Sequence, residues 1–232
     1  MRTIRNIKAI FTKQTLSYFK NESFYAAAGF FMALAIAFAI LAPGSEEEVI
    51  PQFVTLFTGI SMIGAAAGFI REDRTTMNLR FMSMAGVKPY QYLIGSSATL
   101  LLVSFGALII YGLLGRHFGQ DLIQFMAVTM LGAVNSILLG TTLGLHKTLT
   151  NFALVVGLLL GIGPNFAGLN ETLFNIFRLS YTQQVNLTIL GEISFAESLP
   201  VILANTAILL VAFLIMNSRF GLDGERLKKQ TA

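Results

Sequence analysis

Very few side chains in this sequence are placed to do chemistry together. The two histidines, His117 and His146, stand at opposite ends of one long apolar run and therefore cannot share a metal ion. The chain contains no cysteine, which excludes disulfides, thiolate chemistry and zinc–cysteine sites. Ser96 and Ser97 have no neighbouring base of the kind that activates a serine nucleophile. We therefore expect no catalytic residue and no bound metal.

The acidic run from Glu46 to Glu48 is a compact group of carboxylates. A membrane protease that uses glutamate would need a basic or histidine partner on a neighbouring apolar segment, and none follows. A solvated loop on the outer side explains the run instead. The sequence also lacks the Gly-x-x-x-x-Gly-Lys-Ser/Thr phosphate loop of ATPases, so we expect no nucleotide or other cofactor to bind this chain directly.

The positions of the charges explain why so little chemistry is available. Hydrophobic residues make up 54% of the chain and charged residues 12%, about half of the ~25% usual in soluble domains. Six stretches contain no Asp, Glu, Lys or Arg, namely residues 24–42, 53–70, 92–115, 122–145, 152–169 and 199–217. Each is close to the ~20 residues that a helix needs to cross a bilayer, and a helix pairs its own backbone groups in lipid. The sequence therefore predicts an all-α, multi-pass membrane protein with six transmembrane helices.

The basic residues between these stretches predict the orientation. Of the 16 Lys and Arg residues, all but Arg116 and Arg178 fall on the side that holds both chain ends when six spans alternate. Cytoplasmic loops carry such an excess, so we expect both termini in the cytoplasm and the protein in the plasma membrane of a bacterium. A cleaved signal peptide ending near residues 37–39 is the alternative for the first stretch. No basic face interleaved with aromatic residues is present, so no nucleic-acid partner is expected.

Two segments are expected to lie at the membrane surfaces. Residues 1–22 place apolar side chains on one helical stripe and basic side chains opposite it: Ile4, Ile7, Phe11 and Tyr18 against Arg2, Lys13 and Lys20. Such a helix lies in the cytoplasmic interface with its basic side toward lipid phosphates, although a frayed basic tail is an alternative. Residues 170–198 are too apolar for a solvated loop and indicate a helical hairpin in the outer interface. Gly163-Pro164 is expected to break or bend the fifth helix just before it.

The expected organisation is therefore an interfacial helix over 1–22, a six-helix region over 23–218 and a basic cytoplasmic tail over 219–232. Between the second and third spans, the segment 71–91 is long for a connection between neighbouring helices. Asp73 or Thr75 is suited to begin a helix there, Gly86 to end it and Pro89 to prevent its continuation. Apolar side chains recur on one face of this segment at helical spacing: Met77, Phe81, Met84 and Ala85. The pattern predicts a short helix parallel to the membrane, which either contacts a cytoplasmic partner or rests on lipid.

Several short motifs in this segment occur in a recognisable order. Glu72 is followed by Arg74-Thr75-Thr76, then by Ala85-Gly86-Val87-Lys88, and then by Tyr92-Leu93-Ile94-Gly95 at the start of the third span. This order resembles the ABC-2 type permease family of ATP-binding-cassette transporters, in which a similar motif forms the cytoplasmic coupling helix. The sequence departs from the family pattern at Ser96, where a lysine often follows the glycine. The expected layout of the whole chain is also similar to that family.

The resemblance implies a permease without its own ATPase, paired with a second permease chain and with a separate cytoplasmic ABC ATPase that binds ATP. Glu72 and Arg74 would position the coupling helix, while Met77, Phe81 and Met84 would enter a groove of the ATPase. In the second cytoplasmic loop, two further residues would form a weaker contact: Lys147 and Thr148. ATP-driven closure of the ATPase would then drive export of a drug, peptide, lipid or lipid-linked glycan.

Two other functions fit a six-span chain with uncharged spans. The first is a membrane scaffold or an immunity-type protein that transports nothing. The second is an uncoupled secondary carrier, which would bind its substrate through polar residues of the fourth span: Asn135, Ser136, Thr141 and Thr142. Three glycine pairs at a spacing of four indicate close helix packing without favouring any of these functions: Gly64 and Gly68, Gly140 and Gly144, and Gly157 and Gly161.

Overall fold

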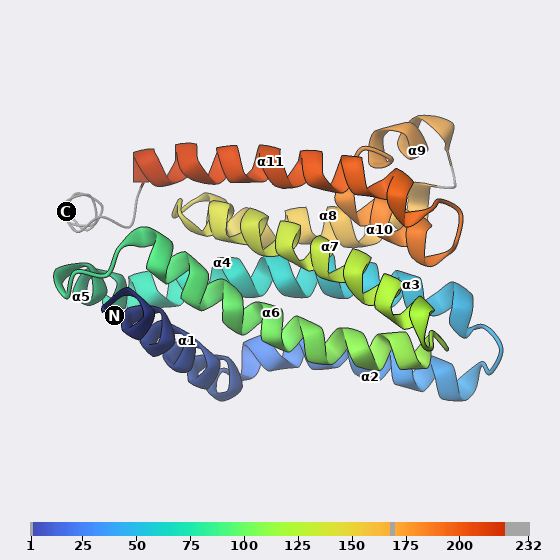
Figure 1. Ribbon diagram of the computed structural model, residues 1–232, viewed down its shortest axis with the longest axis horizontal. Coiled ribbons are helices and arrows are strands. Elements are labelled where there is room, and N and C mark those ends of the chain that lie inside the picture. The colour runs from blue at the N-terminus through green and yellow to red at the C-terminus, as the bar shows by residue number, and fades with distance from the viewer. Residues whose placement is uncertain (1, 168–169, 221–232) are drawn as a thin grey trace.

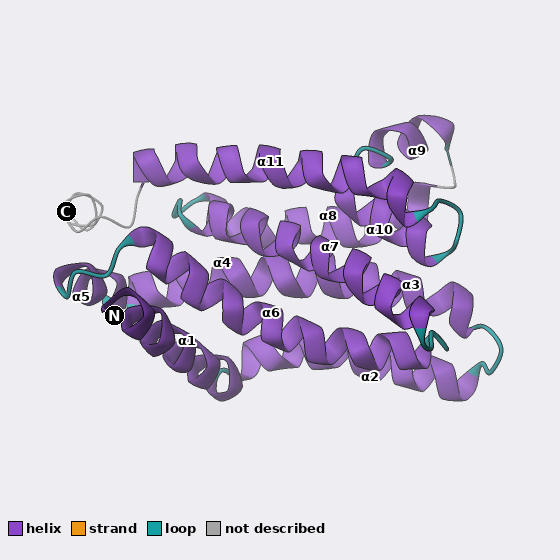
Figure 2. Ribbon diagram, in the orientation of Figure 1, coloured by secondary structure: helices purple, strands orange, loops and turns teal. Residues whose placement is uncertain are grey.

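The computed structural model describes residues 2–167 and 170–220, of which 2, 22–28, 47, 167, 219 and 220 are described in the backbone only. Throughout this part of the chain the regular elements are helices, and no strand is present (Figure 2). The elements in chain order are α1 (Arg2–Lys20), α2 (Glu22–Leu41), α3 (Glu46–Leu56), the π-helical η1 (Phe57–Met62), α4 (Ile63–Thr75), α5 (Asn78–Met84), α6 (Pro89–Leu114), α7 (Gln120–Gly144), α8 (Leu149–Ala167), α9 (Glu171–Phe177), α10 (Tyr181–Ile189) and α11 (Phe195–Phe220).

The long helices lie side by side along the longest axis of the molecule (Figure 1). Five are long and apolar enough to cross a bilayer, and they cover Glu48–Thr75, Pro89–Leu114, Gln120–Gly144, Leu149–Phe166 and Phe195–Ser218 of the described residues. The predicted first span falls on α2, whose described side chains include a shorter apolar stretch, Gly29–Leu41. The prediction of an all-α structure is thus confirmed, and five helices have the length and composition of membrane spans.

The start of α1, the end of α11 and the short helix α5 lie at one end of the bundle, called the α5 end below (Figure 1). The short helices α9 and α10 lie at the other end, called the α10 end. The predicted tail, residues 219–232, falls outside the described residues from position 221 onward, and α11 continues to Phe220.

The second predicted span, 53–70, belongs to a longer helical segment. α3, η1 and α4 follow one another without a break from Glu46 to Thr75, and this segment is the most deeply buried of the five spans. The charged residues 71–74 continue the helix beyond the predicted boundary, and groups of α1 and α7 provide partners for Asp73 and Arg74. Within the segment, Pro51 lies in the helix and the six residues of η1 form the wider turn of a π-helix.

Glycines allow the central helices to approach closely. A Cβ added to Gly140 of α7 would lie 2.8 Å from the Cβ of Ala66 and would also meet the carbonyl oxygen of Ile63. A Cβ on Gly59 of η1 would lie 2.7 Å from the Cα of Gly161 in α8. Two of the three predicted glycine pairs therefore pack against a neighbouring helix. A Cβ on Gly64, in contrast, would have no neighbour within 4 Å.

α1 is a helix, as predicted, and its buried face overlaps the predicted apolar stripe only in part, since Tyr18 belongs to both. It packs on α6, with Ile10, Gln14 and Tyr18 buried and Ile4 exposed. A Cβ at Gly95 of α6 would lie 2.8 Å from the Cβ of Ile10, so the glycine makes this contact possible. The expectation that the basic side of α1 faces only lipid phosphates is wrong for Lys13, because its ammonium contacts Asp73 of α4.

The segment before α11 contains two short helices, as predicted, but only α9 is a surface element. Eight consecutive residues of α10, from Tyr181 to Thr188, are buried, and α10 packs among α3, α7, α8 and α11. α8 continues three residues beyond Pro164 to Ala167, so the expected break at Gly163-Pro164 does not occur. Glu46 was expected in a solvated loop, but it is buried, and its carboxylate pairs with Arg116 at 3.0 Å.

Candidate functional site

The predicted coupling helix corresponds to α5, which is shorter than expected. The prediction that Asp73 or Thr75 begins this helix is wrong, because both residues belong to the last turn of α4. The chain turns at Met77, whose φ of 60° is left-handed, and α5 begins one residue later. Gly86, with a φ of 78°, follows the end of α5, and Pro89 is the first residue of α6. The expected stop signals are therefore confirmed.

One face of α5 is apolar and exposed. The exposed fractions of Met77, Phe81 and Met84 are 41%, 63% and 72%. Phe81 and Met84 are three residues apart in α5, so their side chains share one helical face, and Met77 stands at the left-handed turn directly before the helix. These three exposed side chains are called the α5 face below. Leu79 points the other way and is buried in a cluster with side chains from α1, α4, α6, α7 and α11: Ile10, Ile70, Tyr92, Leu145 and Phe213. α5 is therefore held to the bundle on one side and bare on the other.

The base of α5 is fixed by a buried carboxylate. Asp73 is 1% exposed and accepts hydrogen bonds from side chains of three other elements: Lys13 and Gln14 of α1, Tyr92 of α6 at 2.9 Å, and Asn78 of α5 at 3.4 Å. A carboxylate can be buried at modest cost only when several donors satisfy its oxygens, and this site provides them. The Asp73 cluster joins α1, α4, α5 and α6 at one point.

Arg74 joins the two loops of the α5 end. Its Nη2 donates to the carbonyl oxygens of Gly144 at 2.9 Å and of Leu145 at 2.5 Å, where α7 ends. The last carbonyls of a helix have no partner within the helix, so a guanidinium there completes them and also suits the negative end of the helix dipole. Lys147 and Thr148 follow directly and are exposed. The structure thus brings the second predicted contact beside the base of the first loop.

Glu72 faces α1 rather than the α5 face. Its side chain accepts a hydrogen bond from Asn21 at 3.4 Å, and its carbonyl oxygen accepts one each from the hydroxyls of Thr75 and Thr76. The five residues predicted in this loop therefore separate into two groups. Glu72 and Arg74 hold the loop from inside, whereas the α5 face is free to contact another molecule.

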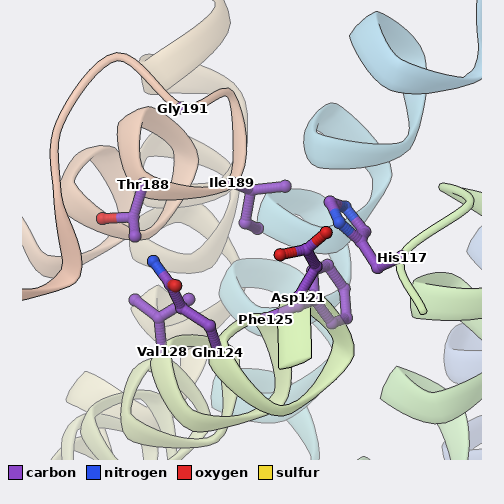
Figure 3. A pocket seen from close by; sticks show the side chains of 8 residues that line it. All are labelled: His117, Asp121, Gln124, Phe125, Val128, Thr188, Ile189 and Gly191. Carbon is purple, nitrogen blue, oxygen red and sulfur yellow. The ribbon is translucent and has the colours of Figure 1, made fainter. Parts of the chain in front are cut away.

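The α10 end contains a second cluster of polar side chains. His117, Asp121, Gln124 and Thr188 line a pocket of about 270 Å³ between α7 and the end of α10 (Figure 3). The ring of His117 stacks on Phe125 with the ring centres 4.8 Å apart. His117 precedes α7 and His146 follows it, so the 25-residue helix separates the two histidines, as predicted. Among the described residues, no group of three His, Cys, Asp or Glu side chains is arranged to hold a metal ion.

Sequence patterns did not indicate the partners of Asp73. Lys13 and Gln14 are 60 and 59 residues from it along the chain, and nothing in the local pattern pairs them. The one available signal was an acidic residue three positions after an apolar run that ends at Ile70, since a charge near the end of a membrane span needs a partner. A comparison of this chain with protein-family models and with curated proteins finds no match.

Proposed function

We propose that this protein is the membrane permease subunit of an ABC-type exporter and that a separate cytoplasmic ATPase binds the α5 face. Two permease chains would form the pathway, and six helices of each chain would span the membrane, with α2 as the first. Both termini would be cytoplasmic, so the α5 end would face the ATPase in the plasma membrane of a bacterium. The chain would bind no nucleotide itself and would export a drug, peptide, lipid or similar amphipathic molecule.

The α5 face is the observation that carries this proposal. Phe81 and Met84 are largely exposed, and burying them against a partner would contribute up to about 1.5–3 kcal/mol each to the free energy of binding. The flexible methionine side chain can adapt to a partner surface that moves. The Asp73 cluster and Arg74 connect α5 to α1, α6 and α7, so a force on α5 would reach the long helices. A helix that merely rested on lipid would not need this internal support.

A secondary carrier is supported less well. Thr141 and Thr142 donate to carbonyl oxygens of their own helix at 2.6 and 2.7 Å, and the amide nitrogen of Asn135 does so at 3.0 Å. Ser136 is within hydrogen-bonding distance of Tyr181 at 2.9 Å. The hydroxyls are therefore already bonded within α7 or to α10, and of these four side chains only Asn135 has an oxygen that accepts no hydrogen bond from a described residue. One unpaired acceptor is a weak basis for a substrate site.

The proposal is tested by photo-crosslinking in membranes of the cells that make the protein. A photoreactive amino acid at position 84 should capture a cytoplasmic ABC ATPase, identified by mass spectrometry, and the two proteins should co-purify. Phe81→Glu places a charge in the contact and should reduce co-purification by at least about tenfold, since 1.4 kcal/mol corresponds to a factor of ten.

Phe118→Glu is the matched control, because Phe118 is also exposed, at 62%, but lies near the α10 end. This variant should co-purify with the ATPase as the wild type does. Crosslinks to lipid alone, or ATPase recovery that Phe81→Glu leaves unchanged, would refute the proposed contact. Capture of the ATPase without stimulated hydrolysis in reconstituted vesicles would favour the scaffold function instead.

A further inference from the structure

α10 is unusually polar for a helix buried inside a membrane protein. Six of its eight buried residues carry amide or hydroxyl groups: Tyr181, Thr182, Gln183, Gln184, Asn186 and Thr188. Each such group must find a hydrogen-bond partner, because an unpaired polar group in a buried site is costly. The sequence therefore has a reason other than packing to place these residues in the interior.

Most of these groups have partners. Gln184 donates to the carbonyl oxygen of Arg178 at 2.6 Å, Thr188 donates to the carbonyl oxygen of Gln184 at 2.7 Å, and the hydroxyls of Thr182 and Ser180 lie 3.2 Å apart. Two amides are different. The side-chain oxygens of Gln183 and Asn186 accept no hydrogen bond from any described residue, although these residues are only 2% and 6% exposed.

The two amides belong to one site. Gln183 and Asn186 are three residues apart, which places them on the same face of α10. Both line a cavity of about 230 Å³ at the α10 end, between α3, α8, α9 and α10. This cavity is distinct from the pocket in Figure 3, which lies on the α7 side of α10 and has other lining residues. The two oxygens have almost no accessible surface, so a ligand in the cavity can reach them only after each amide group turns about its last side-chain bond, which exchanges the positions of oxygen and nitrogen.

The charges around the cavity select the kind of ligand. Glu48 at the start of α3 and Glu192 after α10 are exposed and line it, and no Lys or Arg is among its described lining residues. Phe174 and Leu187 supply an apolar wall. Exposed carboxylates attract a cation, buried amide oxygens bind one that donates hydrogen bonds, and the aromatic ring accepts the attached apolar group.

We infer that this cavity binds a primary ammonium group carried on an apolar body, with Gln183 and Asn186 accepting its N–H donors. The binding step requires neither nucleotide nor a second subunit, so it is independent of the proposed coupling to an ATPase. The ammonium group could come from a soluble amine or from an ethanolamine lipid headgroup, and the experiment separates the two.

Phenethylammonium and its N,N,N-trimethyl analogue form the decisive pair of probes. Both carry one positive charge and the same ring, but the trimethyl compound has no N–H donor. Titration of the full-length protein in phosphatidylcholine nanodiscs, followed by saturation-transfer NMR, should give saturable binding of phenethylammonium and at least about tenfold weaker binding of the analogue, because a hydrogen bond to a charged group contributes about that much. Equal affinity for the two cations, or no saturable binding of either, would overturn the inference.

Variants test which residues form the site. The double substitution Gln183→Leu and Asn186→Leu should weaken phenethylammonium binding at least about tenfold, by the same hydrogen-bond argument. Gln124→Leu, in the neighbouring pocket of Figure 3, is the control and should bind as the wild type does. A folded double variant with wild-type affinity would refute the assignment. If the double variant fails to fold, the comparison of the two cations on the wild-type protein still tests whether the cavity binds a primary ammonium group.

Adding phosphatidylethanolamine to the nanodiscs distinguishes the two sources of ammonium. A lipid headgroup in the cavity would compete with phenethylammonium and raise its apparent dissociation constant, an effect that the double variant would lack. An unchanged dissociation constant would assign the site to a soluble amine.

Discussion

Replacing Asp73 tests whether the α5 end is held together by one carboxylate. Asp73→Ala removes the acceptor for Lys13, Gln14 and Tyr92 at once. The buried Tyr92 hydroxyl then loses its acceptor, and the Gln14 amide keeps only its hydrogen bond of 3.5 Å to that hydroxyl. Because the Lys13 side chain is 34% exposed and can be hydrated, the cost comes from the two buried groups, at about 1–3 kcal/mol for each one left unsatisfied. The loss should be local, because α1 is held to α6 by few other polar contacts: those of Thr99 with Phe11 and Thr15, and that of Asn6 with Gln91.

The assay is hydrogen exchange of the α1 backbone amides, followed by mass spectrometry on protein in nanodiscs. A loss of about 3 kcal/mol should raise the opening equilibrium of α1 by about a hundredfold, while the exchange of α7 changes little. Asp73→Asn keeps one acceptor oxygen and should have a smaller effect. Asp121→Ala removes an exposed carboxylate at the α10 end and should leave α1 unchanged. If α1 in Asp73→Ala exchanges as slowly as in the wild type, the Asp73 cluster does not hold it.

Three further experiments test the packing of α7 on α4, the hydrogen bonds of Arg74 at the end of α7, and the carboxylate of Glu46. Gly140→Ala should lower the thermal unfolding midpoint by several degrees because its Cβ would press on α4, whereas Gly64→Ala, with open space around it, should not; equal midpoints would contradict the close packing. Arg74→Met should increase hydrogen exchange at the end of α7, where two carbonyls lose their donor, and unchanged exchange there would count against the cap. Backbone hydrogen bonds, and after them the nearby Arg116 guanidinium, lower the pKa of Glu46 from its usual 4.5, so its stabilising effect is present above that pH and disappears as pH falls through the lowered pKa. Unfolding midpoints measured across this range should therefore decline in the wild type more than in Glu46→Gln.

The uncharged stretches were enough to predict helices, because a membrane span must satisfy its own backbone and exclude charge. They were less useful for boundaries. The second span was expected to end before Arg71, yet the helix continues to Thr75, where Asp73 pairs with Lys13 of α1 and Arg74 donates hydrogen bonds to carbonyl oxygens at the end of α7. Local sequence contains no information about such distant partners, so an unpaired charge and a satisfied one look alike.

The features of the α5 end that depend on local sequence were predicted, and those that depend on distant partners were not. Spacing alone identified the α5 face, since the apolar positions and the closing Gly86 are local features. The start of α5 was misplaced because Asp73 resembles a helix cap in sequence but serves as a hydrogen-bond acceptor inside the bundle. The burial of α10 could not be predicted, because its amides and hydroxyls resemble those of a solvated surface helix.

The π-helical turn at Phe57–Met62 has a consequence for how this chain can vary. A π turn accommodates more residues than an α turn, so deleting one residue there would restore a regular helix without breaking the chain. The π turn uses about one residue more than an α turn to complete the same rotation, so this deletion would keep Asp73 and Arg74 in nearly the same rotational phase relative to Glu46, which pairs with Arg116 at the opposite end. A deletion in α3 or α4 would instead rotate the two ends relative to each other by about 100°, because each α-helical residue advances the helix by that angle, and both ends could then not keep their partners. A single-residue deletion should therefore be tolerated better within Phe57–Met62 than elsewhere in this helical segment.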